Sequence, residues 1–173
     1  DQCCLPPVPD PRVQHQYPII YDAVKNIGSV QIRNVATIGG NLVNAVPSAD
    51  GAIPLIALDG KAHIYGAKGH RSQDLLRFFL GPGQCDLASG EILLEIIIPP
   101  LLPRTGGAYV KHGRREAMEL PMLGVGVLLS MQEDLKTCAK ARICLGVAAP
   151  TPLRCFTKPV IRCWRGLRHR HNR

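Results

Sequence analysis

Two adjacent glycines, flanked by a hydroxyl and an amide side chain, form the most informative stretch of this sequence. The stretch reads ATIGGN at residues 36–41. Adjacent glycines let several backbone N–H groups point into one concavity and let a ligand approach the backbone closely. Such amides attract a phosphate without a charged side chain, and Thr37 and Asn41 add groups that can bond a pyrophosphate or a ribose. Taken alone, the hexapeptide is more often an ordinary glycine turn, and it is neither a G-x-G-x-x-G motif nor a P-loop.

The other residues whose side chains could do chemistry have simple structural explanations. Ser48 or Asp50 is expected to cap the helix that follows, because a short side-chain oxygen accepts helical N–H groups. Lys111 is consistent with a solvated lysine at a strand end. The seven cysteines include no Cys-x-x-Cys pair, and the six histidines show no metal-like spacing before the C-terminal tail. Zinc and iron–sulfur sites usually need close ligand pairs, so we predict reduced thiols and no metal in this chain.

A helix is expected on each side of the glycine pair in the sequence. Residues 17–28 predict a helix with its apolar side chains on one face, ended by Gly28. A polar loop around Arg33 and Asn34 is expected to lead into the glycine pair. Residues 53–58 predict a short buried helix.

Shorter elements follow as far as residue 100. Residues 61–65 alternate as a strand does, and residues 72–80 predict a second helix closed by Gly-Pro-Gly. The apolar run at residues 91–98 predicts a buried strand, halted by two prolines. A subdomain boundary is expected in the loop that follows.

The second half of the chain reads as strands in succession. A strand is expected at residues 108–112 and another at residues 139–147, with an apolar run at residues 123–131 between them. Strands without long helices between them favour an antiparallel sheet. The fold class predicted is therefore α+β, in two pieces.

Composition excludes several classes of protein. Apolar residues make up 46% of the chain and charged residues 20%, which is typical of a folded domain. No apolar run approaches the roughly 20 residues needed to span a bilayer, and no signal peptide is evident, so a cytoplasmic protein is expected. The formal charge of +8 is concentrated between Arg154 and Arg173, a segment with seven basic side chains and no acidic one. The charge is therefore a property of the tail and does not by itself predict nucleic-acid binding.

The wider order of motifs resembles the FAD-binding subunits of the molybdenum hydroxylases. The segments that carry the resemblance are QIRNVATIGGNLVNAVPSADGAIPLIALDG, FFLGPGQ, GEILLEIIIP, AYVKHGRREAMEL and LGVAAPTPLR, in that order. Their spacing is most similar to that of the FAD subunit of bacterial xanthine dehydrogenase. It is similar also to carbon monoxide dehydrogenase medium subunits and to the flavoprotein subunit of hydroxybenzoyl-CoA reductase. The resemblance covers roughly residues 12–154, and several motifs agreeing in order are strong evidence.

The resemblance implies a cofactor, FAD, and a role for eight residues. In that family the T-I-G-G-N loop wraps the FAD pyrophosphate, which assigns this role to Thr37, Ile38, Gly39, Gly40 and Asn41. Asp50 would bond ribityl or ribose hydroxyls, which suits a carboxylate acceptor. Leu93 would pack against the adenine. Lys111 would lie beside the flavin, where a cation could stabilise the reduced anionic form.

The resemblance also implies partners and domain limits. The molybdopterin centre and the iron–sulfur clusters would belong to partner subunits, and the flavin would pass electrons to NAD+ or another acceptor such as oxygen. Residues 1–100 would be the second subdomain of an α/β FAD-binding domain. Residues 101–155 would be part of the antiparallel-sheet subdomain, and residues 156–173 an atypical basic tail. No catalytic residue, specific nucleic acid or membrane contact is predicted.

Both ends of the chain depart from the family pattern. The family's first subdomain carries an A-G-G-x-S/T/D loop that cradles the other side of the pyrophosphate, and DQCCLPPVPDP has no such loop. After residue 155 an alanine- and glutamate-rich helix is replaced by FTKPVIRCWRGLRHRHNR. Out-of-frame or truncated translation would explain both departures. Two other functions therefore stay open: a remnant that docks on partner subunits without flavin, and nonspecific binding of nucleic acid by the tail.

Overall fold

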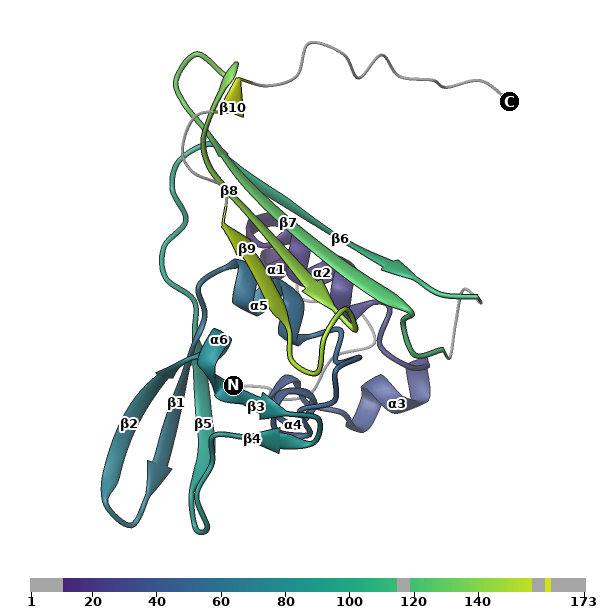
Figure 1. The fold of residues 1–173 in the computed structure, drawn as a ribbon, viewed down its shortest axis with the longest axis vertical. Coiled ribbons are helices and arrows are strands. Elements are labelled where there is room, and N and C mark those ends of the chain that lie inside the picture. The colour runs from purple at the N-terminus through teal and green to yellow at the C-terminus, as the bar shows by residue number, and fades with distance from the viewer. Residues whose placement is uncertain (1–10, 115–118, 157–160, 163–173) are drawn as a thin grey trace.

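A computed structural model describes residues 11–114, 119–156 and 161–162. Within these residues the helices, drawn in Figure 1, are α1 Pro11–Gln16, α2 Pro18–Val24, α3 Val30–Val35, α4 Ile38–Val43, α5 Ala52–Ala57 and α6 Leu75–Phe78. The strands are β1 Lys61–Gly66, β2 Gly69–Asp74, β3 Phe79–Gly81, β4 Gln84–Cys85, β5 Ile92–Ile97, β6 Thr105–His112, β7 Leu123–Met131, β8 Thr137–Gly146, β9 Leu153–Phe156 and β10 Ile161–Arg162. The predicted α+β class is confirmed.

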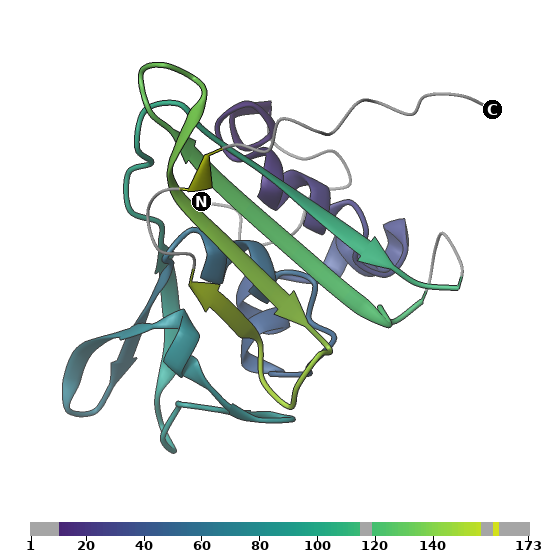
Figure 2. The ribbon, with the colours of Figure 1, turned by 45° about the horizontal axis from the view of Figure 1, so that its top comes forward.

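The larger sheet is antiparallel and has helices on one face. Its strands run in the order β10-β8-β7-β6, with β9 also paired to β8. Figures 1 and 2 show α1, α2 and α5 behind this sheet, where α2 lies against β6 and α5 lies against β7 and β8. Strand β6 therefore passes over α2.

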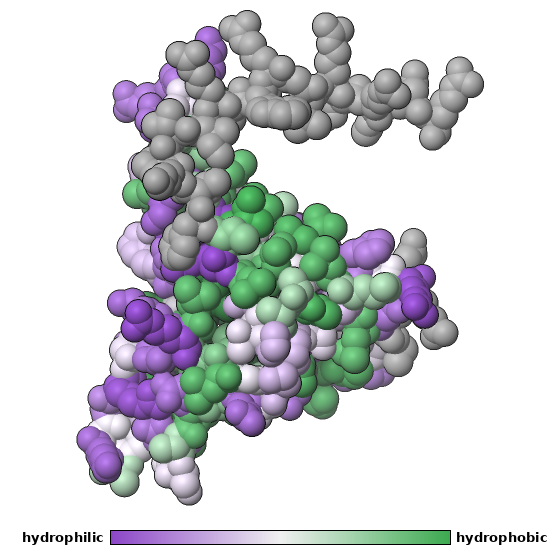
Figure 3. Space-filling view, in the orientation of Figure 1, coloured by the Kyte–Doolittle hydropathy of each residue, from purple (hydrophilic) through white to green (hydrophobic). Residues whose placement is uncertain are grey.

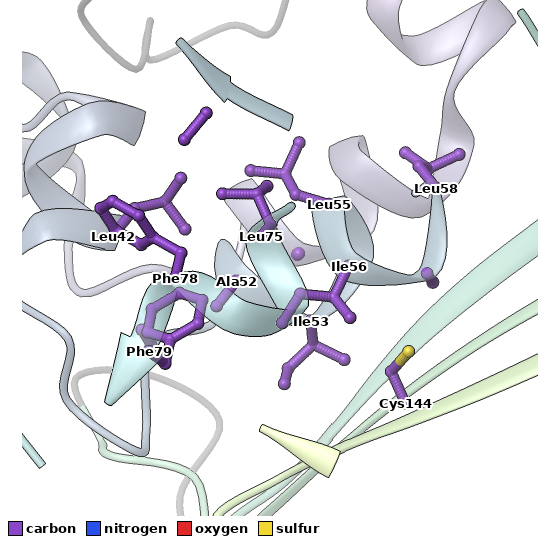
Figure 4. Close-up of a cluster of buried hydrophobic side chains, with 14 of the residues drawn as sticks. Leu42, Ala52, Ile53, Leu55, Ile56, Leu58, Leu75, Phe78, Phe79 and Cys144 are labelled. Atoms are coloured by element: carbon purple, nitrogen blue, oxygen red, sulfur yellow. The ribbon is translucent and has the colours of Figure 1, made fainter. Parts of the chain in front are cut away.

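The hydrophobic core forms where α5 meets α6 and the sheet. Every residue of α5 is buried, because its sequence AIPLIA is apolar on all sides and elements surround it. Figure 4 shows its side chains beside Leu42, Phe78, Phe79 and Cys144. The core thus includes residues from both sides of position 100. Burial raises the pKa of Cys144 to about 12.

The opposite face of the larger sheet is apolar and uncovered among the described residues. Strand alternation turns Val110, Leu129 and Leu153 outward, and they are 63%, 40% and 42% exposed. The space-filling view of this face shows hydrophobic surface over the strands (Figure 3). This face contrasts with the inner one, where Tyr109 and Leu128 are buried.

The smaller sheet, β2-β1-β5, corrects two predictions. The helix expected at residues 72–80 is wrong, because β2 pairs antiparallel with β1 and only the turn α6 is helical. Pairing across the hairpin overrides the local preference of this segment. The strand at residues 91–98 exists as β5, but it is not buried as expected, because Ile92 and Leu94 are more than half exposed.

Two further predictions are corrected around the glycine pair. The loop expected at Arg33 and Asn34 is the helix α3, capped by Ser29, whose hydroxyl accepts the Ile32 N–H at 3.3 Å. Its apolar residues are exposed, so it lacks the buried stripe that marks a helix in sequence. Neither expected cap of α5 is its N-cap. That position is Gly51, and no side chain caps it.

Several predictions concern residues that the structure does not describe. Residues 1–10 lie there, as does most of the predicted tail at 156–173. Over the described ranges, no helix has both the length and the hydropathy needed to cross a bilayer.

Candidate functional site

The glycine pair forms the first turn of α4. Thr37 is the N-cap, with an extended backbone, and its hydroxyl oxygen accepts the N–H of Gly40 at 2.9 Å. This is the usual N-cap geometry, in which a side-chain oxygen satisfies one of the first helical N–H groups. Helix geometry leaves the N–H groups of Ile38 and Gly39 without an acceptor inside the helix.

Asn41 directs its carbonyl oxygen into the protein. Its Oδ1 accepts the N–H of Gly51 at 3.1 Å. An amide side chain carries two N–H donors besides this oxygen, and a threonine hydroxyl carries one donor besides its acceptor lone pairs. The oxygens of Thr37 and Asn41 are engaged inside the protein. The Thr37 O–H and the Asn41 N–H groups can still donate to a ligand.

Leu93 lies beside the glycine pair. A Cβ placed on Gly39 would come 3.7 Å from Leu93 Cδ2, an ordinary contact distance. Gly40 is exposed, and Gly39 and Leu93 are half-buried. The structure therefore brings together six of the eight predicted residues, Thr37 to Asn41 with Leu93.

Asp50 and Lys111 form a separate, buried pair. Lys111 Nζ donates to Asp50 Oδ2 at 2.9 Å and to the backbone oxygen of Asn26 at 3.0 Å. The Tyr109 hydroxyl donates to Asp50 Oδ1 at 2.5 Å. The Asp50 side chain is 7% exposed and that of Lys111 14%. Both carboxylate oxygens are thus engaged by the protein itself.

This pairing changes how the two residues must be described. Sequence reasoning gave Asp50 and Lys111 independent roles at the cofactor, while in the structure their side chains bond one another across 61 residues of chain. Burial raises the pKa of the Tyr109 hydroxyl, and the neighbouring Asp50 carboxylate raises it further because it accepts the phenolic proton. Tyr109 is therefore a firm hydrogen-bond donor to Asp50.

Sequence reasoning missed Tyr109, Asn26 and Gly51. Strand alternation could have found Tyr109, because it lies two residues before Lys111 on the same face of β6. Its neighbour Val110 points the other way and is exposed. No sequence signal identifies Asn26 or Gly51, which contribute only backbone groups to these contacts.

A second charged cluster lies away from these residues. The Asp59 carboxylate, at the end of α5, is paired with Arg142 and with Arg154 on β8 and β9. Arg142 also donates to the backbone oxygen of Ala57 at 3.0 Å. A cavity of about 520 Å³ lies beside this cluster, and none of the eight predicted residues lines it. The cluster ties the helix end to the sheet.

Metal ligation has no candidate in the described ranges, because no group of three or more histidine, cysteine, aspartate or glutamate side chains converges there. The arrangement that remains is a surface of hydrogen-bond donors at the glycine pair, backed by a buried ionic cluster. Donors without a cation suit a ligand that carries acceptor oxygens.

Known proteins are similar to this chain in sequence and in fold. Residues 7–101 match the family described as "FAD binding domain in molybdopterin dehydrogenase". The xanthine dehydrogenase FAD-binding subunit of Escherichia coli O157:H7 is 36% identical over 149 residues, which are 86% of this chain and 50% of that protein. The carbon monoxide dehydrogenase medium chain of Hydrogenophaga pseudoflava is 32% identical over 85% of this chain and 50% of its own.

Solved structures agree with these matches. Carbon monoxide dehydrogenase from Hydrogenophaga pseudoflava superposes with a TM-score of 0.78 at 32% identity, over 84% of this chain and 50% of that one. Quinoline 2-oxidoreductase from Pseudomonas putida 86 gives a TM-score of 0.75 at 28% identity. The chain spans about half the length of the curated relatives it matches. It belongs to the family of FAD-binding subunits of molybdopterin dehydrogenases.

Proposed function

We propose that this chain holds FAD in an electron-transfer subunit of a molybdopterin-dependent oxidoreductase. The single observation that carries the proposal is the donor surface at Thr37 to Asn41, within a chain that belongs to the FAD-binding family. The predicted division into a subdomain before residue 100 and a sheet subdomain after it is part of this proposal.

The residues present fit one side of a pyrophosphate. The N–H groups of Ile38 and Gly39, the Thr37 hydroxyl and the Asn41 amide are all donors, and a pyrophosphate supplies only acceptors. Gly40 is exposed and Gly39 half-buried, so the backbone is open to close approach. Leu93 provides apolar surface beside the glycines, which suits an adenine ring.

The cofactor's own role and the chain's role are distinct. When bound, FAD supplies the redox chemistry, and the protein supplies its position and electrostatic surroundings. Thr37 to Asn41 would bind the pyrophosphate, and Leu93 would orient the adenine. Lys111 would place a positive charge near the flavin, moderated by its pairing with Asp50.

Partners follow from the relatives. The similar proteins are a FAD-binding subunit of xanthine dehydrogenase and a medium chain of carbon monoxide dehydrogenase. We therefore propose partner subunits that carry the molybdopterin and the iron–sulfur clusters, with NAD+ or another acceptor receiving the electrons, in the cytoplasm. The outward apolar face of the larger sheet is compatible with a chain that is covered in an assembly.

Titration with FAD tests the proposal. Quenching of flavin fluorescence by the purified full chain should saturate. Gly39→Val and Gly40→Val should weaken the affinity about tenfold or more, since tenfold corresponds to about 1.4 kcal/mol and a hydrogen bond to a charged group is worth that much or more. Gly106→Val is the matched control, because a Cβ at Gly106 meets nothing within 4 Å.

Two results would overturn the proposal. No saturable quenching by a folded chain would favour a remnant that docks on partner subunits without flavin. Equal affinity of the wild type and both glycine variants would place the cofactor elsewhere. Binding to nonspecific DNA that disappears as salt rises would instead favour the basic tail as the functional element.

A further inference from the structure

The cavity beside Asp59 has the size of a small-molecule site. Its volume is about 520 Å³, and small ligands typically occupy pockets of about 300–1,000 Å³. Its wall includes residues from α5, the start of β1, α6 and β9. Because Lys61, Asp74 and Arg77 of this wall are exposed, a ligand can enter the cavity from solvent.

Positive side chains outnumber negative ones around this cavity. Asp74 is the cross-strand partner of Lys61, so these two charges offset one another. Among the described residues, five cations and two carboxylates line the cavity or pair with one of its residues: Lys61, Arg77, Lys140, Arg142 and Arg154 against Asp59 and Asp74. The wall therefore has a surplus of positive charge.

Part of this surplus is buried. Asp59 Oδ1 accepts from Arg154 at 2.5 Å, and Asp59 Oδ2 accepts from Arg142. The side chains of Arg142 and Arg154 are 15% and 16% exposed, and one carboxylate neutralises only one of the two guanidinium groups. A charge removed from water is unfavourable unless an opposite charge compensates it. An anion in the cavity would supply that compensation.

We propose that this cavity binds the phosphate group of a small molecule. A phosphate offers acceptor oxygens and more than one negative charge, which match guanidinium donors and the positive surplus. The cavity is larger than one phosphate, and Ile56, Leu76 and Pro99 give its wall an apolar part. The site shares no residue with the proposed FAD site, so the two proposals stand or fall separately.

Nuclear magnetic resonance of the full chain, titrated with inorganic phosphate, tests the site. The backbone amides of Gly60 and Leu76, which line the cavity, should shift and saturate. A folded chain in which neither amide shifts would overturn the proposal. Shifts confined to Gly39 and Gly40 would place the anion at the first turn of α4 and would overturn it as well.

Charge-removing variants show which cations bind the anion. Arg77→Gln and Lys61→Gln should each weaken phosphate binding about tenfold, since a hydrogen bond to a charged group contributes at least that much. Both side chains are exposed, so neither change disturbs the core. Arg104→Gln is the matched control, because Arg104 is an exposed arginine, paired with Glu133, that does not line the cavity. Equal phosphate affinity of Arg77→Gln and Arg104→Gln would overturn the proposal, and Arg77→Gln should bind FAD as the wild type does.

Phenyl phosphate distinguishes the two sources of a phosphate group. If the ligand is an organic phosphate, the ring packs on the apolar part of the wall, and phenyl phosphate binds several-fold more tightly than inorganic phosphate. Equal affinity of the two compounds assigns the cavity to free phosphate. Either result supports the anion site, whereas failure of both compounds to bind would overturn it.

Discussion

The first turn of α4, from Thr37 to Asn41, and the Asp50 cluster are built from similar polar groups but use them in opposite ways. In this turn, the side-chain oxygens of Thr37 and Asn41 accept backbone N–H groups, and both side chains also carry donors. In the cluster, every polar side-chain group of Asp50 is engaged by Tyr109 and Lys111 inside the protein. Gly40 of this turn is exposed and its neighbours are half-buried, whereas the cluster is buried.

This difference separates recognition from support. A group whose hydrogen-bonding capacity is left over can bind a ligand, while a group that is fully engaged in the interior contributes stability and geometry. A carboxylate is chemically suited to either use, so residue type alone does not distinguish them. What the structure adds is the identity of the partners of Asp50, which are Tyr109 and Lys111.

The largest effect is expected from Asp50→Ala. This substitution leaves the Lys111 ammonium buried without its carboxylate, which typically costs about 3–5 kcal/mol of unfolding free energy. Urea denaturation measures it. Asp22→Ala is the control, because Asp22 pairs with the more exposed Lys25, and a surface pair contributes about 1 kcal/mol or less. If both variants lost a similar amount of unfolding free energy, the Asp50 cluster would stabilise the fold no more than a surface ion pair does.

A smaller effect is expected from Gly51→Ala, which acts where the two regions meet. The added methyl group overlaps Asn41 and Ile38 and should cost about 1–3 kcal/mol of unfolding free energy. FAD affinity should fall as well, because the loop must move. Gly106→Ala adds the same methyl group in open space and should change neither quantity. Unfolding curves and FAD titrations of both variants, compared with the wild type, check this.

The smallest effect is a pH dependence from Tyr109. Its pKa is raised in the folded protein, so the unfolded chain loses the phenolic proton first as pH rises through the ordinary value of 10.0. The folded state then binds more protons than the unfolded state, and the unfolding free energy decreases above about pH 10. Tyr109→Phe should reduce this decrease, and Tyr65→Phe should retain it. The midpoints of urea unfolding of the wild type and both variants, measured between pH 8 and about pH 11, check this prediction.

Sequence patterns predicted the elements whose apolar residues are buried in a regular period. The strands β1 and β6 and the helix α5 were found because burial sets their pattern. The helix α3 was missed because a helix without a buried face carries no such pattern. The hairpin strand β2 was mistaken for a helix because pairing with β1, which sequence periodicity does not report, determines its conformation.

The sequence predicted the spatial arrangement of one region of the candidate site better than that of the other. Thr37 to Asn41 are five consecutive residues, so the proximity of Thr37, the glycines and Asn41 follows from the sequence itself. The roles given to these residues and to Leu93 and Lys111 remain predictions from family resemblance. The bond between Asp50 and Lys111 spans 61 positions and depends on how β6 crosses the helices, which no local pattern encodes.

The distance along the chain between Asp50 and Lys111 has a consequence for synthesis. Because the donors to the Asp50 carboxylate lie on β6, Asp50 leaves the ribosome long before the strand that engages it. At about 5–20 residues per second, the 61 positions that separate the pair correspond to roughly 3–12 seconds of translation. During that interval Asp50 lacks both of its donors, so the buried cluster forms only after strand β6 has emerged.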